Sequence, residues 1–272
     1  MKKIFVTAFA IGLTSLLGVS SPVMAGSLGN NITIYDGTGY EGTSTGGEDG
    51  EAEPGMDNSQ VWDLEGFFLN GSTLSMVAGF DFKYGVTGHP LYTSGDLFID
   101  TDGNLGNTQT SYSPSDGFNT VESNFGYEFV FDLDFDNLTY NIVQLDDTAS
   151  TITADLAANE AGTPGSNPWK YESGGTEIGN GSFGFTSGLT DSDTGFSGGS
   201  HYALTGFDLA PIMSSLGIST SLDFTSHFTM GCGNDNLMGS GTAPVPEPAT
   251  MLLFGTGLVG LATVGRKKMK RA

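Results

Sequence analysis

Residues 127–135 read Tyr-Glu-Phe-Val-Phe-Asp-Leu-Asp-Phe and carry the clearest structural signal in the chain. Aromatic residues and a leucine occupy the odd positions, and acidic residues hold most of the even positions. A period of two is typical of a β-strand with one buried face and one solvated face. Asp136-Asn137 then precedes a second apolar stretch, residues 138–145, so the two segments are expected to form a hairpin.

Similar signals recur along the chain. Asn70-Gly71 separates the apolar stretches 61–69 and 73–82, and Asn-Gly in that position strongly favours a hairpin. Other short stretches rich in aromatic and β-branched residues are expected to be strands. They are residues 31–35, 94–100, 182–185, 201–209 and 219–230.

Few segments suggest a helix. A short helix is expected within residues 148–160 and a single helical turn at 211–216, while 231–243 has the composition of a flexible linker. The chain contains 42 glycines and 19 phenylalanines, a combination that suits aromatic strands joined by tight turns. We therefore expect an all-β fold, an antiparallel β-sandwich of jelly-roll or lectin-like type. A β-barrel is the second choice, and a β-helix or propeller the third.

The chain opens with a segment typical of a secretory signal peptide. Met1-Lys2-Lys3 is positively charged, residues 4–17 are mainly apolar, and Val23-Met24-Ala25 provides the residues of a cleavage site. We expect a signal helix outside the fold, used by the Sec route and removed after Ala25. The alternative is an N-terminal membrane anchor, for which the apolar stretch is short.

The chain ends with a second targeting segment. Val245-Pro246-Glu247-Pro248 leads into an uncharged apolar stretch, residues 249–264, and a basic cluster follows. The basic cluster consists of Arg266, Lys267, Lys268, Lys270 and Arg271. An apolar span followed by cations is typical of a stop-transfer helix. Sixteen helical residues reach only ~24 Å, less than a ~30 Å hydrocarbon core, which favours a sorting signal over a permanent anchor.

This tail resembles the PEP-CTERM sorting tail of Gram-negative bacteria, because the Pro-Glu-Pro motif, the apolar span and the basic cluster occur in the same order. The resemblance implies recognition at the inner membrane by an exosortase, a membrane transpeptidase, in a host that produces exopolysaccharide. Residues 227–235, which read His-Phe-Thr-Met-Gly-Cys-Gly-Asn-Asp, also resemble a stretch that precedes the tail in several exosortase substrates. An ordinary C-terminal membrane anchor is the alternative.

These segments divide the chain into a signal peptide (1–25), one domain (26–243) and a sorting tail (244–272). Residues 26–244 contain two lysines against 30 acidic residues, a formal charge of −28. Such a domain repels nucleic acid and anionic lipid, so its partners are expected to be cations, neutral glycans or basic surfaces. The single cysteine, Cys232, excludes an intramolecular disulfide.

The best candidate for a metal site follows the strand at 94–100. Asp100, Asp102 and Asn104 offer oxygen ligands around the bend at Gly103, which is the chemistry that calcium prefers. The spacing differs from that of a helix-loop-helix calcium site, and a solvated turn is the alternative. Two weaker candidates are also acidic. They are Asp191 with Asp193, and the series Asp132, Asp134 and Asp136 on one strand face.

Enzyme chemistry finds little support in the sequence. Chance carboxylate pairs such as Asp63 and Glu65 are expected among so many acids, and no glycosidase motif surrounds them. Cys232 lies five residues after His227, but no cation is near in sequence to activate a thiol. Together with His89 and His201, the three histidines of the chain show no zinc spacing, so none of these residues indicates a catalytic site.

We therefore expect an exported, non-catalytic protein of the cell surface or exopolysaccharide matrix, anchored in the inner membrane only until its tail is processed. The first alternative is a calcium-assisted carbohydrate-binding module with Trp62, Trp169 and Tyr171 stacking on sugars. The second is a secreted glycoside hydrolase or lyase.

Overall fold

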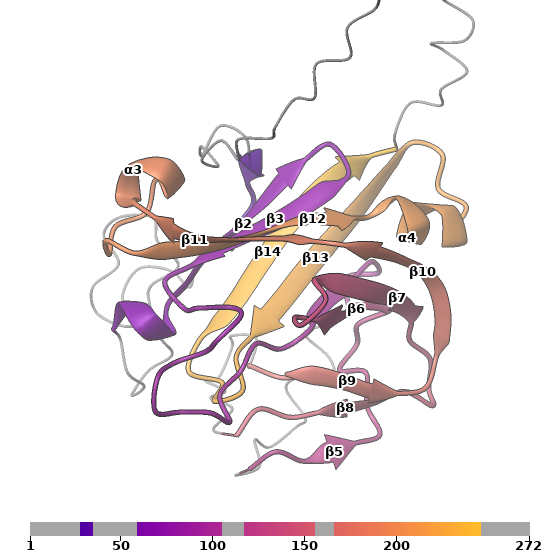
Figure 1. Ribbon diagram of the computed structural model, residues 1–272. Coiled ribbons are helices and arrows are strands. Elements are labelled where there is room, and N and C mark those ends of the chain that lie inside the picture. The colour runs from indigo at the N-terminus through magenta and orange to yellow at the C-terminus, as the bar shows by residue number, and fades with distance from the viewer. Residues whose placement is uncertain (1–27, 35–58, 105–116, 156–165, 246–272) are drawn as a thin grey trace, which may run out of the picture.

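The computed structural model describes residues 28–34, 59–104, 117–155 and 166–245 (Figure 1). Within these residues no helix is long and apolar enough to cross a membrane. The signal helix expected at 1–25 and the membrane-spanning helix expected at 249–264 lie outside the described residues.

The expected all-β class is confirmed, since strands dominate the described residues. The strands are β1 (Asn30–Asn31), β2 (Leu64–Asn70), β3 (Thr73–Ala78), β4 (Leu97–Asp100), β5 (Thr120–Val121), β6 (Phe129–Asp134), β7 (Thr139–Gln144), β8 (Ser150–Ile152), β9 (Lys170–Ser173), β10 (Thr176–Ser182), β11 (Gly184–Leu189), β12 (His201–Asp208), β13 (Ser221–Thr229) and β14 (Asn236–Pro244). The described helices are short: η1 (Gln60–Trp62), α3 (Asp191–Thr194) and α4 (Ala210–Ser215).

Two antiparallel sheets pack face to face as a β-sandwich. The five-stranded sheet has the order β1-β2-β3-β12-β11, and the six-stranded sheet has the order β10-β7-β6-β4-β13-β14. In Figure 1, β2, β3 and β12 lie across β13 and β14. The core between the sheets is rich in fully buried phenylalanines, among them Phe67, Phe80, Phe129, Phe131 and Phe207. Alternation of side chains along each strand delivers these rings to one face.

The chain crosses between the two sheets on both sides of the sandwich. Phe183 alone separates β10, in the six-stranded sheet, from β11, in the five-stranded sheet. On the other side, β1 pairs with β2, and the next residue, Ile32, accepts a hydrogen bond from the Ser240 amide of β14. Ile34 in turn donates to the Met238 carbonyl. Residues 30–34 therefore connect β14, the last strand before the sorting tail, to β2 of the five-stranded sheet.

A small third sheet, with the order β5-β8-β9, gives the six-stranded sheet a second buried face. That second core contains Phe98, Phe125, Tyr127, Val130, Val143, Leu145 and Ala149. Tyr127 was expected on the same face as Phe129, and this expectation is wrong. Phe125 and Gly126 have φ angles of 53° and 84°, and this turn sends the Tyr127 ring to the opposite face before β6 begins.

Both predicted hairpins are confirmed, as β2–β3 and β6–β7, and the helical turn at 211–216 corresponds to α4. The helix expected within 148–160 is wrong for its described part, which holds β8. The linker expected at 231–243 is also wrong, because β14 pairs with β13 along its whole length. Its glycines have a packing role. A Cβ on Gly239 would lie 2.8 Å from Phe67, so glycine lets the two sheets approach closely.

Candidate functional site

Asp100 is the last residue of β4 and lies in the middle of the six-stranded sheet. Asp100 is 2% exposed. Its strand, β4, pairs with β6 on one side and with β13 on the other. One carboxylate oxygen, Oδ1, accepts hydrogen bonds from the amides of Asp102 (3.0 Å) and Gly103 (2.9 Å). Gly103 has a φ of +78°, which favours glycine. The turn predicted from Asp100 to Gly103 thus folds back on its own first carboxylate.

Glu128 completes a group of three carboxylates that the sequence did not reveal. One oxygen from each of Asp100, Asp102 and Glu128 lies within 4.8 Å of the others. Glu128 Oε2 accepts hydrogen bonds from the Thr101 amide (2.6 Å) and hydroxyl (3.1 Å), which hold it beside the turn. Glu128 lies directly before β6, and only the pairing of β4 with β6 brings its carboxylate close to the turn at Asp100 to Gly103. We call Asp100, Asp102 and Glu128 the carboxylate cluster.

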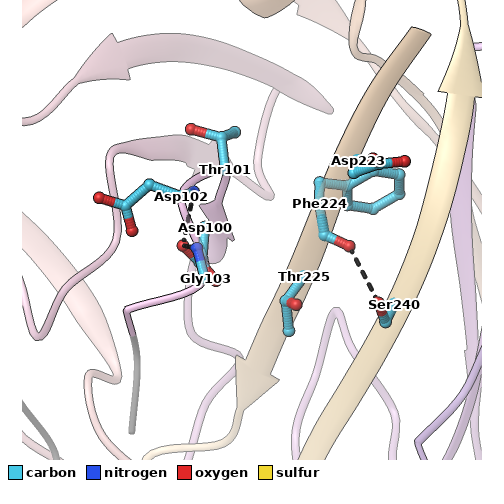
Figure 2. A pocket seen from close by; sticks show the side chains of 8 residues that line it. All are labelled: Asp100, Thr101, Asp102, Gly103, Asp223, Phe224, Thr225 and Ser240. Atoms are coloured by element: carbon cyan, nitrogen blue, oxygen red, sulfur yellow. Dashed lines mark hydrogen bonds between the residues drawn. The ribbon is translucent and has the colours of Figure 1, made fainter. Parts of the chain in front are cut away.

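Two members of the carboxylate cluster, Asp100 and Asp102, line a pocket of about 270 Å³. Figure 2 shows Asp100 to Gly103 on one side of this pocket and β13 and β14 on the other. Asp223, Thr225 and Ser240 from those two strands contribute further oxygen atoms to the lining. The pocket is therefore lined by carboxylate and hydroxyl groups, with Phe224 as its large apolar side chain.

Asn104, the third residue of the predicted site, lies beside the carboxylate cluster. Its backbone amide donates to Asp102 Oδ1 (3.0 Å) and its side-chain amide donates to Asp102 Oδ2 (2.8 Å). In this position Asn104 orients the exposed Asp102 carboxylate, while Glu128 supplies the third side-chain oxygen.

The surroundings of Glu128 make its ionisation more costly. Burial raises the pKa of Glu128, and the charges of Asp100 and Asp102 raise it further, against the lowering effect of the Thr101 hydrogen bonds. A cation placed between the three groups would relieve this repulsion. An all-oxygen set of carboxylates and hydroxyls suits a hard cation such as calcium better than a transition metal.

The weaker acidic candidates serve local structure. Asp193 accepts hydrogen bonds from the Thr190 amide and hydroxyl at the start of α3, as a helix-capping residue. Asp134 accepts bonds from the amides of Asp136 and Asn137 and so closes the β6–β7 turn. In both places hydrogen bonds lower the pKa of the capping carboxylate.

His227 and Cys232 lie in different cores. The His227 ring stacks on Tyr127 in the second core, and its Nε2 lies 2.9 Å from the Pro168 carbonyl oxygen. Cys232 belongs to the core between the two large sheets. Burial lowers the pKa of His227 to about 4 and raises the pKa of the Cys232 thiol to about 12. The imidazole is therefore neutral and the thiol protonated at neutral pH, unlike an activated nucleophile pair.

The buried His201 ring contacts two carboxylates, which sequence reasoning missed. Its Nδ1 lies 2.6 Å from Glu65 Oε1, and its Nε2 lies 3.0 Å from Asp191 Oδ1. Gln60 Nε2 donates to the same Glu65 oxygen. These contacts tie α3 to β2 and β12. No sequence pattern indicated them, since the partners are 136 and 10 residues away from His201.

The three aromatic residues considered for sugar stacking are largely covered. Trp62 is buried and has edge contacts with His89 and Tyr92. The Trp169 ring lies between Phe118, with centroids 4.8 Å apart, and the Lys170 ammonium, 4.9 Å from its centroid. Tyr171 is partly buried, and its hydroxyl donates to the Gly174 carbonyl.

The sorting motif begins directly after the last strand. β14 ends at Pro244, and the Val245 amide donates to the Thr220 carbonyl (3.0 Å). The rest of the sorting motif, the basic cluster and the cleavage residue Ala25 lie outside the described residues.

Residues 244–268 match the family model of the PEP-CTERM protein-sorting motif. No curated protein and no solved structure matches the chain. The chain therefore carries an exosortase-substrate sorting tail, which implies export and sorting to the cell surface. The match covers the tail only, so the role of the preceding domain has to be argued from its own geometry.

Proposed function

We propose that the protein is a non-catalytic component of the cell surface or exopolysaccharide matrix of a Gram-negative bacterium, exported by Sec and released from a transient inner-membrane anchor by an exosortase. The observation that carries the proposal is the sorting motif at residues 244–268, placed directly after β14. A cut within the Pro-Glu-Pro segment leaves every described strand with its partners, since β14 ends at Pro244. Neutral His227 and protonated Cys232 support the non-catalytic part.

Processing is tested by the intact mass of the protein recovered from the surface of an exosortase-containing host. The expected mass lacks residues 1–25 and the tail beyond about residue 246. A variant with Pro246→Ala and Pro248→Ala is the matched control, and it should keep its tail and stay with the membrane. Full-length C-terminal peptides recovered from the surface of cells with the unaltered chain would contradict the proposal.

A second candidate function is calcium-assisted carbohydrate binding. The carboxylate cluster favours it, because three carboxylates converge and two of them, Asp100 and Asp102, line a pocket that also offers hydroxyl groups. A calcium ion held by Asp100, Asp102 and Glu128 would have coordination positions left for sugar hydroxyls or water. Trp62 contributes little to this candidate because it is buried, and Trp169 and Tyr171 are only partly exposed. Its first test is calcium binding itself.

A further inference from the structure

Both cationic residues of the domain face one cavity. Lys83 and Lys170 are the only lysines or arginines among residues 26–244, and they are 87 positions apart in the sequence. Both line a cavity of about 460 Å³ between the segment after β3, the end of β6 and the start of β9. In a domain with 30 acidic residues, this is the place where positive charge gathers.

Neither lysine forms an ion pair with a described carboxylate, although Asp134 and Asp136 line the same cavity. The charge of Lys170 also acts on Asp132, where it opposes the rise in pKa that burial causes. The ion pairs of the described residues involve His201 only, and neither ammonium has a hydrogen bond or ion pair with a described residue. Each instead lies over the aromatic ring next to it in sequence, Lys83 over Tyr84 and Lys170 over Trp169. Cation–π contacts of this kind orient an ammonium group and leave its N–H donors available to a ligand.

The rest of the cavity lining combines an apolar floor with hydrogen-bonding groups. Phe82, Leu133 and Phe135 supply the floor, and Asp134, Asp136 and Thr93 supply oxygen atoms. Carboxylate acceptors beside ammonium donors, above aromatic carbon, match the hydroxyl groups and C–H face of a sugar ring. The two ammonium groups balance the formal charge of Asp134 and Asp136, so a preference for an acidic sugar depends on where the ammonium donors lie and not on a net positive charge.

A buried carboxylate fixes two walls of the cavity. Asp96 Oδ1 accepts a hydrogen bond from the Leu133 amide of β6 (2.9 Å), and Oδ2 accepts one from the Tyr171 amide of β9 (2.9 Å). Asp96 is 2% exposed, so these bonds are sheltered from water. These two hydrogen bonds set the spacing between β6, which ends at Asp134, and β9, which begins at Lys170. The cavity is therefore built by the fold and does not depend on mobile side chains alone.

We propose that this cavity binds an acidic sugar, with Lys83 and Lys170 holding the carboxylate of a uronic acid residue. Asp134 and Asp136 accept hydrogen bonds from the ring hydroxyls, and the partly exposed Phe135 contacts the apolar face of the ring. The inference rests on the proposed function, which places the domain in contact with exopolysaccharide. It departs from the neutral glycans expected from the overall charge, because both lysines of the domain line this one cavity. It differs from the calcium candidate in site, because the carboxylate cluster lies at a separate pocket.

Calorimetric titration of the full chain in a non-ionic detergent, with trigalacturonate as probe, tests the assignment. EDTA is included so that calcium cannot bridge the probe to the carboxylate cluster. The fully methyl-esterified trimer, which keeps the sugar ring and removes the charge, should bind at least tenfold more weakly. Lys83→Gln with Lys170→Gln should weaken binding of the acid at least tenfold and leave the ester unaffected. Both side chains are partly exposed, so the variant is expected to fold.

Ser219→Asp with Thr220→Asp controls for the general effect of a charge change of −2, since both residues are exposed. Ser219 precedes one end of β13, whereas Ser94 of the cavity bridges Met230 just past the other end. Nine strand residues separate them by about 30 Å. This control should bind the acid as the unaltered chain does. Equal affinity for acid and ester, equal loss in the control and the lysine variant, or complete competition by equimolar sulfate would overturn the proposal. The intact mass of the processed protein would be unaffected, so failure here is distinguishable from failure of the proposed function.

Discussion

The middle of the six-stranded sheet is buried on both faces, and the two faces differ in their chemistry. Toward the five-stranded sheet it presents an almost entirely apolar layer built around Phe131. Toward the small third sheet, the apolar layer around Phe98 shares its interior with the titratable ring of His227, and Asp96 is buried at the junction with β9. The first face should stabilise the fold at any pH, whereas the second should make stability depend on pH.

The largest expected effect comes from emptying either core. Phe131 and Phe98 are both fully buried, so Phe131→Ala and Phe98→Ala should each lower the free energy of unfolding by about 3–5 kcal/mol. The two variants should differ in pH response. A cavity at Phe98 opens the surroundings of His227, with which it is in ring contact, whereas a cavity at Phe131 does not. Denaturant unfolding at pH 5 and pH 8 would show this, and an identical pH response in both variants would contradict the distinction between the faces.

A smaller effect is expected from the two titrating groups themselves. Burial raises the pKa of Asp96 to about 7, so the folded state keeps a proton that the unfolded chain loses near pH 4. Its contribution is fully present below about pH 4 and is lost as the pH rises to about 7. Burial lowers the pKa of His227 to about 4, against 6.5 in the unfolded chain. Its contribution is fully present above about pH 6.5 and is lost as the pH falls to about 4.

These opposite trends should partly cancel in the unaltered chain. Asp96→Asn should leave the histidine trend, with stability rising between pH 4 and 6.5, while His227→Gln should leave stability falling over the same interval. At about 1.4 kcal/mol per unit of pKa difference, the whole histidine trend amounts to roughly 3 kcal/mol and the whole aspartate trend to roughly 4 kcal/mol. Subtracting the profile of the unaltered chain removes the contribution of the exposed carboxylates. Parallel profiles in all three proteins would show that neither group titrates in this way.

The contrast between the faces also explains what the sequence could predict. The alternation in 127–135 identified the apolar face, because Phe129 and Phe131 face one core. It could not identify the second face, since a third sheet formed by short, polar strands leaves no periodic pattern. Nor could it reveal β14, whose glycines contact Phe67 and Leu69 across the sandwich and resemble a linker in composition.

The candidate sites show the same division between local and distant information. Asp100 and Asp102 were found because they are neighbours on one turn. Glu128 was missed because the pairing of β4 with β6 alone brings it to that turn. Lys83 and Lys170 stand far apart in the sequence, and their shared cavity depends on three separate segments. Contacts between residues that are close in the sequence could be predicted, whereas contacts that depend on strand pairing could not.

The smallest expected effect is calcium stabilisation at the carboxylate cluster. Binding to the folded state alone stabilises it by RT ln(1 + [L]/Kd), about 2.7 kcal/mol at a hundredfold excess over Kd. A weak extracellular site has a Kd of about 10⁻⁴–10⁻³ M, so millimolar calcium should raise the melting temperature by a few degrees. Magnesium should do less, because it requires tighter octahedral geometry. Asp100→Asn with Asp102→Asn should abolish the calcium response, and Glu128→Gln should reduce it.

General screening of a domain with charge −28 is the competing explanation for any calcium response. Asp146→Asn with Asp147→Asn provides the matched control, since it removes the same charge at two exposed residues outside the carboxylate cluster. Sodium chloride at equal ionic strength measures the screening part directly. If Asp100, Asp102 and Glu128 form a cation site, the control keeps the calcium-specific shift and the cluster variant loses it. Equal shifts in the two double variants would show that the cluster is a solvated turn beside a strand.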